Sequence, residues 1–182
     1  MDNYKLDTIT EIDIDKILDI YNSNTHFLEN HMGITEVSRE FITNEIKEMK
    51  NIGFNSLVIK DCRSNIIGIC DFKISEEVYL SLLMIDANQQ GKGLGSIVYN
   101  QLEKLFKENH ANKVRIDVVY NYDHNAVDFW KKQGFIPCEK IKLEWNGYKT
   151  NAIKMLKFIW WLLIKYFSIG FPSKFASVNK NW

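Results

Sequence analysis

The chain has few of the residues that cross-link or hinge a protein. Its three cysteines, Cys62, Cys70 and Cys138, are widely spaced and form no CxxC pair. Such a set predicts reduced thiols in a cytoplasmic protein and argues against a disulfide framework or a metal site. Only Pro137 and Pro172 occur, and no repeat or low-complexity stretch divides the sequence. We therefore expect no proline-rich hinge between domains.

An excess of charge of one sign is also absent. Lysine plus arginine number 23 and aspartate plus glutamate number 23, so the formal net charge is zero. Nothing in this balance favours nucleic acid or another polyanionic partner. Recognition of an anionic ligand must therefore be local. Residues 1–5 also lack the apolar segment of a secretory signal, which favours a cytoplasmic location.

Glycine is scarce, with nine in the 182 residues, but three gather in one short stretch. Gly91, Gly93 and Gly95 follow an apolar run over residues 80–85 and precede a helical pattern that continues through Glu108. A strand, a glycine-rich turn and a helix together direct bare backbone N–H groups at a phosphate. The alternative is an ordinary tight connection, because such spacing recurs in turns.

Two kinds of phosphate loop do not fit this stretch. A P-loop needs Gly-Lys followed by serine or threonine, and Lys92 is followed by Gly93. A dinucleotide fingerprint needs GxGxxG, whereas these glycines are separated by single residues.

The stretch Gln90-Gly91-Lys92-Gly93-Leu94-Gly95 instead resembles the Gln/Arg-x-x-Gly-x-Gly/Ala signature of the GCN5-related N-acetyltransferase (GNAT) family. A second block over residues 125–135, from Asn125 to Gly134-Phe135, is similar to the family's Asn-x-x-Ala-x-x-x-Tyr-x-x-x-Gly-Phe block. The two blocks occur in the family's order. The resemblance covers roughly residues 4–157.

The pattern of elements predicts a mixed α/β domain over residues 1–157. Strands are expected at 4–9, 54–59, 66–74, 78–85 and 113–119, followed by a hairpin through Asn146-Gly147 that returns over 148–157. Four helices are expected: one that begins near Ile14, one that follows the N-cap Ser38, one that follows the glycine-rich stretch and ends at Glu108, and one over 125–133. The resemblance implies a mostly antiparallel sheet of six to seven strands, flanked by helices and splayed between the fourth and fifth strands to form a cofactor cleft.

The resemblance further implies that acetyl-CoA occupies this cleft as cosubstrate. Backbone groups of Met84 and Ile85 would pair with the pantetheine, and the glycine loop would hold the pyrophosphate. Phe129 and Trp130 would flank the pantetheine arm, with packing in the core as the alternative for Phe129. Asp123 stands at the spacing of the family's asparagine, with Asn121 and Asn125 on either side. The expected cofactor-binding set is Met84, Ile85, Gln90, Gly91, Lys92, Gly93, Leu94, Gly95, Ser96, Asn121, Asn125, Phe129, Trp130 and Lys132.

Acyl transfer to an amine needs a donor for the oxyanion, and we expect the backbone N–H of Ile85 or its neighbour to serve. The departing thiolate benefits from a proton, which a tyrosine of the second block supplies in many family members. Trp130 stands at that position, and an indole N–H does not ionise at neutral pH. The acid is therefore replaced or unnecessary. Tyr120 and Tyr122 are the nearest phenols in the sequence.

The general base is left open by the sequence. Asp71, Glu76, Glu77 and Asp86 lie near the strands that would border the acceptor, although each also suits a solvated turn. His26 and His31 lie in the segment 22–36 between the first helices, which tends to wall the acceptor pocket in this family.

Residues 158–182 form an extension that begins with an apolar run over 158–167. The run is too short to span a bilayer, which needs about 20 apolar residues. We expect it to be buried, in part at a homodimer contact, and a peripheral membrane contact is the alternative. The sequence thus predicts an N-acetyltransferase that acts on a primary amine of a small molecule or peptide. The alternatives are a non-catalytic CoA-binding module or a scaffold assembled through the tail.

Overall fold

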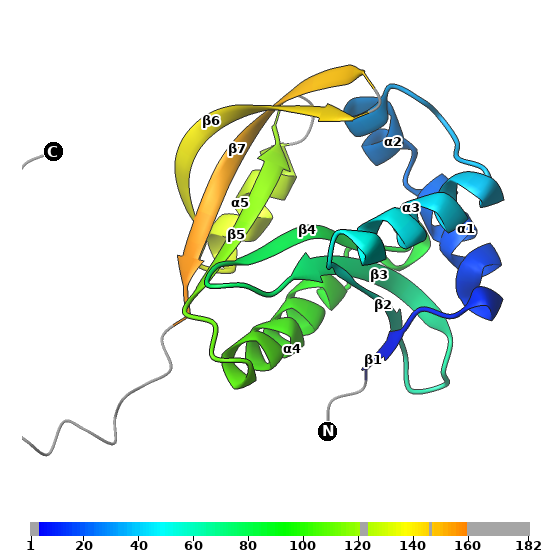
Figure 1. Ribbon diagram of the computed structural model, residues 1–182, viewed down its shortest axis with the longest axis horizontal. Coiled ribbons are helices and arrows are strands. Elements are labelled where there is room, and N and C mark those ends of the chain that lie inside the picture. The colour runs from blue at the N-terminus through cyan, green and yellow to red at the C-terminus, as the bar shows by residue number, and fades with distance from the viewer. Residues whose placement is uncertain (1–3, 121–123, 146, 160–182) are drawn as a thin grey trace, which may run out of the picture.

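A seven-stranded sheet with the order β1-β2-β3-β4-β5-β7-β6 forms the centre of the protein (Figure 1). The computed structural model describes residues 4–120, 124–145 and 147–159. Neighbouring strands are antiparallel except for the parallel pair β4–β5, which confirms the mixed, mostly antiparallel sheet expected from the sequence. The strands are β1 Lys5–Thr8, β2 Asn55–Lys60, β3 Ile66–Lys73, β4 Val78–Ile85, β5 Lys113–Val119, β6 Ile136–Trp145 and β7 Tyr148–Phe158.

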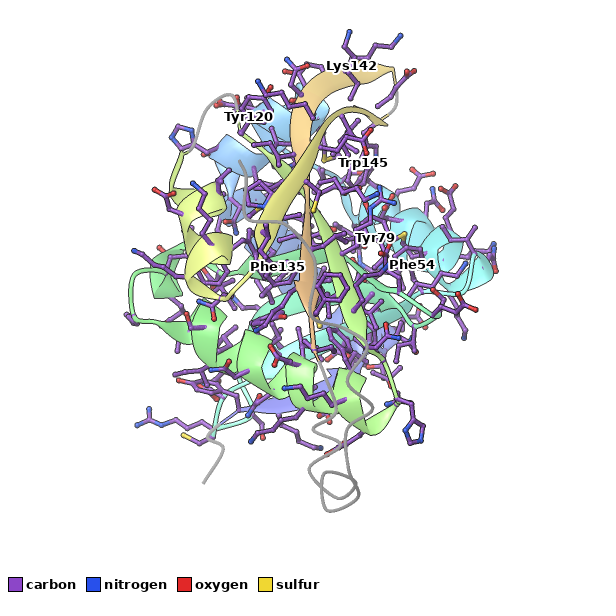
Figure 2. All side chains as sticks on the ribbon, turned by 90° about the vertical axis from the view of Figure 1, so that its left-hand side faces the viewer. Phe54, Tyr79, Tyr120, Phe135, Lys142 and Trp145 are labelled. Atoms are coloured by element: carbon purple, nitrogen blue, oxygen red, sulfur yellow. The ribbon has the colours of Figure 1, made fainter. Side chains whose placement is uncertain are left out.

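Helices cover both faces of the sheet and bury two separate hydrophobic clusters. The first cluster contains Val98, Leu102 and Phe106 of α4, together with residues of β5 and Phe135, which Figure 2 shows between α5 and the sheet. The second cluster contains side chains from α1, α2 and α3 on the opposite face. The helices are α1 Ile14–Ser23, α2 Thr25–Met32, α3 Arg39–Asn51, α4 Leu94–Glu108 and α5 His124–Lys132, with short 3₁₀ turns at Glu11–Asp13 and Ala87–Gln89.

The N-terminus of α3 follows the expected capping pattern. The Ser38 hydroxyl accepts a hydrogen bond from the Phe41 backbone N–H at 3.1 Å. Val37 and Ile42, on either side of this cap, are both buried in the second cluster. A side-chain cap and a hydrophobic pair of this kind fix where a helix starts.

A bulge in β4 changes which face its side chains point to. The register with β3 shifts between Asp71 and Phe72, and Ser81 is the additional residue on β4. Leu80 packs in the first cluster, whereas Leu82 packs in the second. Bulges of this kind redirect side chains and are frequent beside active sites. Here the bulge turns Leu83 toward the face covered by α4.

β4 and β5 pair only at Val78–Val114 and Tyr79–Arg115. Beyond these two pairs the strands separate, although β4 continues to Ile85 and β5 to Val119. This divergence confirms the splay expected between the fourth and fifth strands. Within the part of the chain that the structure describes, no strand pairs with this edge of β4 over its second half.

Helix α2 was not among the expected elements, because segment 22–36 was interpreted as a connection. The helix has eight residues, too few to be stable alone, and only Leu28 and Met32 are buried. Its end is fixed by Gly33, whose φ is +69°. A Cβ there would lie 2.6 Å from the Tyr148 ring of the β6–β7 hairpin. Packing of this helix end under the hairpin therefore requires glycine.

The described chain ends two residues beyond the expected domain boundary at 157. Ile159 is buried, with 2% of its surface exposed, and its N–H donates to the Asn112 carbonyl at 2.8 Å. Phe158, the last residue of β7, is half exposed. The rest of the apolar extension, 160–182, lies outside the described residues. Within the described ranges, no helix has the length and apolar character to cross a membrane.

Candidate active site

The glycine loop runs from the end of β4 to the start of α4. Gly91 and Gly93 both have φ of +76°, in the left-handed region that favours glycine. A Cβ added at either position would meet no atom within 4 Å, so both face open space. Gly95 has a different role, because a Cβ there would lie 3.2 Å from the Phe129 ring. It allows α4 and α5 to approach each other.

A cleft of about 650 Å³ opens above this loop, between α4, α5 and the end of β4. Its size suits an extended ligand such as a pantetheine with its pyrophosphate. Open N–H groups at the start of α4 and the cationic Lys132 at the rim fit an anionic group. The lining residues are Leu83, Ile85, Gln90, Gly91, Gly93, Leu94, Gly95, Ser96, Ala126, Phe129, Trp130 and Lys132. Ten of the fourteen residues expected to bind the cofactor therefore lie together.

The other four have separate positions. Met84 is buried in the second cluster and does not line the cleft. Lys92 folds along the loop, with Nζ 2.8 Å from the Gln89 side-chain oxygen. Asn125 belongs to α5. Asn121 lies outside the described residues, as do Asp123 and the acid candidate Tyr122.

The free edge of β4 offers backbone groups to this cleft. Asp86 donates its N–H to the Ile67 carbonyl of β3 at 2.9 Å. Bonded and non-bonded pairs alternate along an antiparallel ladder, so Met84 belongs to the bonded set and Leu83 and Ile85 do not. The N–H groups of Leu83 and Ile85 therefore point away from β3, toward the side from which β5 has diverged. An extended amide chain can add to such an edge.

A second cavity, of about 150 Å³, lies between the diverging strands on the side of α2. Its lining includes Phe27 and His31 of α2, the bulge residue Ser81, and residues 116–119 of β5. Leu83, Ala126 and Trp130 line both cavities. Two ligands that enter from opposite faces of the sheet would therefore meet at these three residues.

Two titratable groups line the second cavity. Burial lowers the pKa of His31 to about 4, although its Nδ1 lies 3.2 Å from the Phe27 carbonyl, so the imidazole is neutral at pH 7. Asp117 has only 3% of its side chain exposed and receives two hydrogen bonds from Arg115, at 3.0 and 2.7 Å. The Asp117 charge is therefore compensated from within the protein.

Trp130 connects the two cavities to the core. Its indole makes edge-to-face contacts with Phe129, Phe135 and Tyr99, at ring-centroid distances of 4.9, 5.2 and 5.5 Å. Nearby, a hydrogen bond also joins α4 to the residue that follows α5, because Gln133 Nε2 donates to the Ser96 hydroxyl at 2.9 Å. Packing against these three aromatic rings thus holds the indole in place.

The family model of the acetyltransferase (GNAT) family matches residues 16–135, more than half of the 182-residue chain. The match includes both sequence blocks that form the cleft. The chain belongs to the GNAT family. A search of curated protein sequences gives no significant match.

Solved structures of GNAT acetyltransferases share this fold. A spermidine N-acetyltransferase from Vibrio cholerae, in complex with CoA and spermine, has a TM-score of 0.71 at 17% identity, over 87% of this chain and 96% of that chain. A ribosomal-protein-alanine N-acetyltransferase from Brucella melitensis has a TM-score of 0.64 at 20% identity, over 85% and 99%. A PaiA N-acetyltransferase from Thermoplasma acidophilum, in complex with coenzyme A, has 0.59 at 18%, over 85% and 98%. The expected family and fold are confirmed, and with the family acetyl-CoA as cosubstrate.

Most carboxylates considered as the base of this GNAT protein lie away from both cavities. Glu76 and Glu77 lie at the turn before β4, and Glu77 pairs with Lys113 at 2.8 Å. Asp86 lies 3.5 Å from Lys16 Nζ and accepts from the Asn88 N–H. His26 is exposed on α2. His31 does line the second cavity.

Tyr120, an acid candidate, directly follows β5 and packs partly against the first cluster. Figure 2 shows it at the end of the sheet that carries the hairpin tip with Lys142 and Trp145. Lys140 Nζ lies 6.0 Å from its ring centroid. Tyr120 is not among the residues that line either cavity.

Asp71 is buried under α1 and α3, where Tyr21, Glu45 and Ser56 surround the same small cavity of about 10 Å³. Asp71 lines neither the cleft nor the second cavity, and we do not retain it among the proposed catalytic groups. Burial raises the pKa of Asp71 to about 6. Burial, reinforced by the charges of Asp71 and Glu48, raises the pKa of Glu45 to about 7. The two carboxyl groups thus favour protonation in the folded state.

A folded-state pKa above the unfolded value makes stability fall as the pH rises. We expect the contribution of protonated Asp71 to the free energy of unfolding to be fully present below about pH 4 and to be lost as the pH rises through its folded pKa of about 6. Asp71→Asn should therefore be roughly 2–3 kcal/mol more stable than wild type at pH 8, and the difference should shrink to about 1 kcal/mol at pH 4.5. Urea unfolding at both pH values measures this. Asp128→Asn, at an exposed carboxylate, is the control, and an equal pH dependence in wild type and Asp71→Asn would contradict the prediction.

Several site residues were missed by the sequence interpretation. Leu83, Ala126 and Phe27 read as ordinary core positions, and nothing in their spacing distinguishes them. Asn24 was not considered, although its contacts hold the end of β4. Gly33, as a helix-ending glycine, was the available signal for α2 and hence for the wall that carries Phe27 and His31.

Proposed function

We propose that this protein transfers the acetyl group of acetyl-CoA to a primary amine of a small molecule or peptide by direct attack. The observation that carries the proposal is the pair of cavities that meet at Leu83, Ala126 and Trp130. The larger one carries the glycine loop and suits the cofactor, and the smaller one suits the amine-bearing end of the acceptor. A single direct transfer requires this opposed arrangement.

The cofactor side would be organised by backbone groups. N–H groups of residues 90–95 would bind the pyrophosphate at the start of α4, and Lys132 would add a cation at the rim. The free edge of β4 would align the pantetheine amides through Leu83 and Ile85. Bound acetyl-CoA supplies the activated acyl group. The N–H of Ile85 would stabilise the charge that develops on the carbonyl oxygen.

The acceptor side would keep the amine neutral. A lysine-like amine has a pKa of about 10.4 and is mainly protonated at pH 7, so it must lose a proton before attack. Partial desolvation in the smaller cavity favours the neutral form. His31 would stay neutral beside the amine, because burial lowers its pKa to about 4, and Asp117 is already bound by Arg115. The proton of the amine would therefore leave to solvent through water molecules rather than to a side chain of this cavity.

A panel of amines assayed with acetyl-CoA tests the function. Primary monoamines, polyamines and peptides with free N-termini should be compared at pH 8, with released thiol as the readout. We expect turnover with at least one class and a product heavier than the amine by one acetyl group. Omission of the amine is the control for hydrolysis of the thioester.

Trp130 favours a second candidate, a CoA-binding module without catalysis, because it occupies the position of the family's acid. Micromolar binding of acetyl-CoA by calorimetry, without turnover of any amine, would support that candidate. Absence of both binding and turnover would contradict both functions.

We further propose a cytoplasmic homodimer in which the apolar extension contributes to the contact. Truncation after Ile159 should lower the mass measured by light scattering to that of one chain, or cause aggregation. Truncation after Pro172, which removes only the polar end, should leave the mass unchanged. A chain ending at Ile159 that stays soluble with the full-length oligomeric state would contradict the proposal.

A further inference from the structure

The carbonyl of Ile85 is held by two side-chain amides at the end of β4. Asn24 Nδ2 donates to it at 3.1 Å, and Gln90 Nε2 donates to it at 3.0 Å. The two amides are also joined to each other, because Gln90 Nε2 donates to Asn24 Oδ1 at 2.8 Å. Both lone pairs of the carbonyl are thus used, and the three groups form a closed ring of hydrogen bonds.

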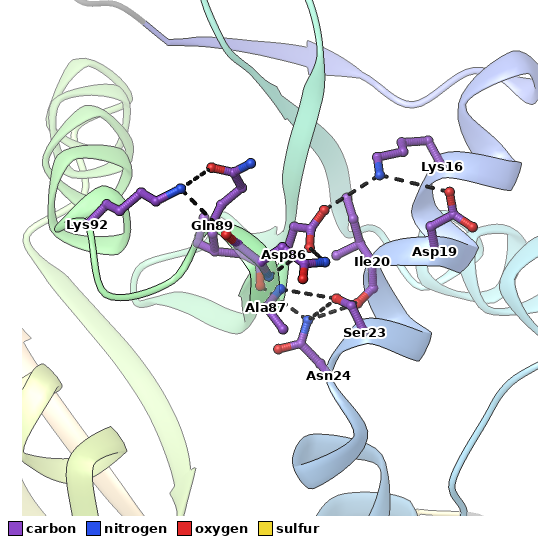
Figure 3. A network of polar contacts seen from close by, with 11 residues as sticks. Lys16, Asp19, Ile20, Ser23, Asn24, Asp86, Ala87, Gln89 and Lys92 are labelled. Carbon is purple, nitrogen blue, oxygen red and sulfur yellow. Dashed lines mark hydrogen bonds and ion pairs between the residues drawn. The ribbon is translucent and has the colours of Figure 1, made fainter.

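Asn24 is the residue between α1 and α2, and its backbone is not helical. Its amide also donates to the Ile20 carbonyl at 2.8 Å, which fixes the side chain relative to α1. Figure 3 shows Asn24 and Ser23 at this corner, directed toward Ala87 and Asp86 of the loop. Ser23 Oγ accepts from the Ala87 N–H at 3.1 Å. The corner of two helices therefore holds the end of β4.

The other side of the same peptide is held by β3. The N–H of Asp86 donates to the Ile67 carbonyl, so the peptide that joins Ile85 to Asp86 is bonded from both sides. The N–H of Ile85 itself points toward the cleft, on the same edge as its carbonyl. Rotation of the strand end would turn this N–H away. A ring of amides that fixes the carbonyl consequently fixes the direction of the N–H.

We propose that Asn24 is a positioning residue for acyl transfer, which aims the Ile85 N–H at the oxyanion by holding the Ile85 carbonyl and the Gln90 side chain. This inference rests on the proposed function. It also gives Gln90 a role in addition to its backbone contact with the cofactor. Asn24 directly precedes α2, the helix that carries Phe27 and His31. The same hydrogen bonds therefore also fix the position of this wall of the second cavity relative to the end of β4.

Two variants of Asn24 separate this role from general stability. Asn24→Ala removes both links, and Asn24→Asp keeps the acceptor for Gln90 but replaces the donor to the Ile85 carbonyl by an oxygen. A misplacement of about 1 Å can cost about 100-fold in rate, so we expect kcat to fall about 10- to 100-fold in both. The KM for acetyl-CoA should change less than about 3-fold in Asn24→Asp, because the pyrophosphate contacts remain.

Asn30→Ala is the matched control. Asn30 lies in α2, the helix that Asn24 precedes, and its amide also donates to a carbonyl four residues earlier, that of His26 at 2.9 Å. Among the described residues, no hydrogen bond joins Asn30 to β4. Its kcat should equal that of the wild type. Equal kcat in Asn24→Asp, Asn24→Ala and wild type would overturn the proposal, as would a loss confined to KM.

Hydrogen–deuterium exchange gives a readout that needs no acceptor. Amides of residues 80–88 should exchange faster in both Asn24 variants than in wild type, and at the wild-type rate in Asn30→Ala. Unchanged exchange would overturn the positioning role even if activity fell. If the wild-type protein acetylates no amine, the proposed function fails, and the exchange comparison alone decides whether Asn24 holds the end of β4.

Discussion

Replacing Gly93 by aspartate is expected to weaken the binding of CoA by roughly 100-fold or more. Gly93 lines the cleft directly before α4, and a side chain at this position projects into open space. A carboxylate there would stand beside the pyrophosphate. Two like charges about 4 Å apart repel by about 4 kcal/mol at an effective dielectric constant of 20, which is enough for such a loss.

Gly93→Asn is the matched variant for this experiment. Asparagine has nearly the same size and tolerates positive φ about as well as aspartate, so backbone strain is equal in the two proteins. Calorimetry with CoA should show a much smaller loss for asparagine, and thermal unfolding should show both variants folded. Equal affinities of folded Gly93→Asp and Gly93→Asn would contradict a phosphate site at the loop.

The parts of the fold that local sequence determines were predictable. Strands β4 and β5 have the bounds expected from their apolar runs, and Trp145 pairs with Tyr148 at the end of the expected hairpin, whose turn residue Asn146 lies outside the described residues. The glycine loop was recognisable because Gly91 and Gly93 need a left-handed backbone that few other residues adopt. In these segments the chemistry of neighbouring residues alone favours the structure.

The acceptor side was less predictable because long-range contacts create it. Helix α2 depends on packing of Gly33 under Tyr148, more than a hundred residues away in the sequence. The amide of Asn24 reaches Ile85 and Gln90, which are 61 and 66 residues away. An asparagine between two helices reads as a simple cap, so its second role appears only when the strand end lies beside it. The burial of Asp71 is likewise a long-range effect, because nothing in its own strand indicates that α1 and α3 cover it.

Trp130→Ala is expected to lower the free energy of unfolding by about 3 kcal/mol and to raise the Kd for acetyl-CoA. The indole is partly buried and contacts three aromatic rings, so its removal leaves a cavity between α5 and α4. It also lines both cavities, and its loss removes a wall from the pantetheine. Urea unfolding and calorimetry measure the two effects separately.

Trp130→Tyr and Trp130→Phe then test the proton of the leaving thiolate. Tyrosine and phenylalanine fill much of the same space and differ only in the hydroxyl group. If the indole has no proton role, kcat of Trp130→Tyr should equal or exceed that of the wild type, and the ratio of kcat between Tyr and Phe reports the benefit of a phenol. Equal loss of kcat in Trp130→Tyr and Trp130→Ala, with Kd unchanged, would mean that the indole itself stabilises the transition state. In that case Trp130 takes over the catalytic role of the family's tyrosine, and its presence does not indicate a non-catalytic CoA-binding module.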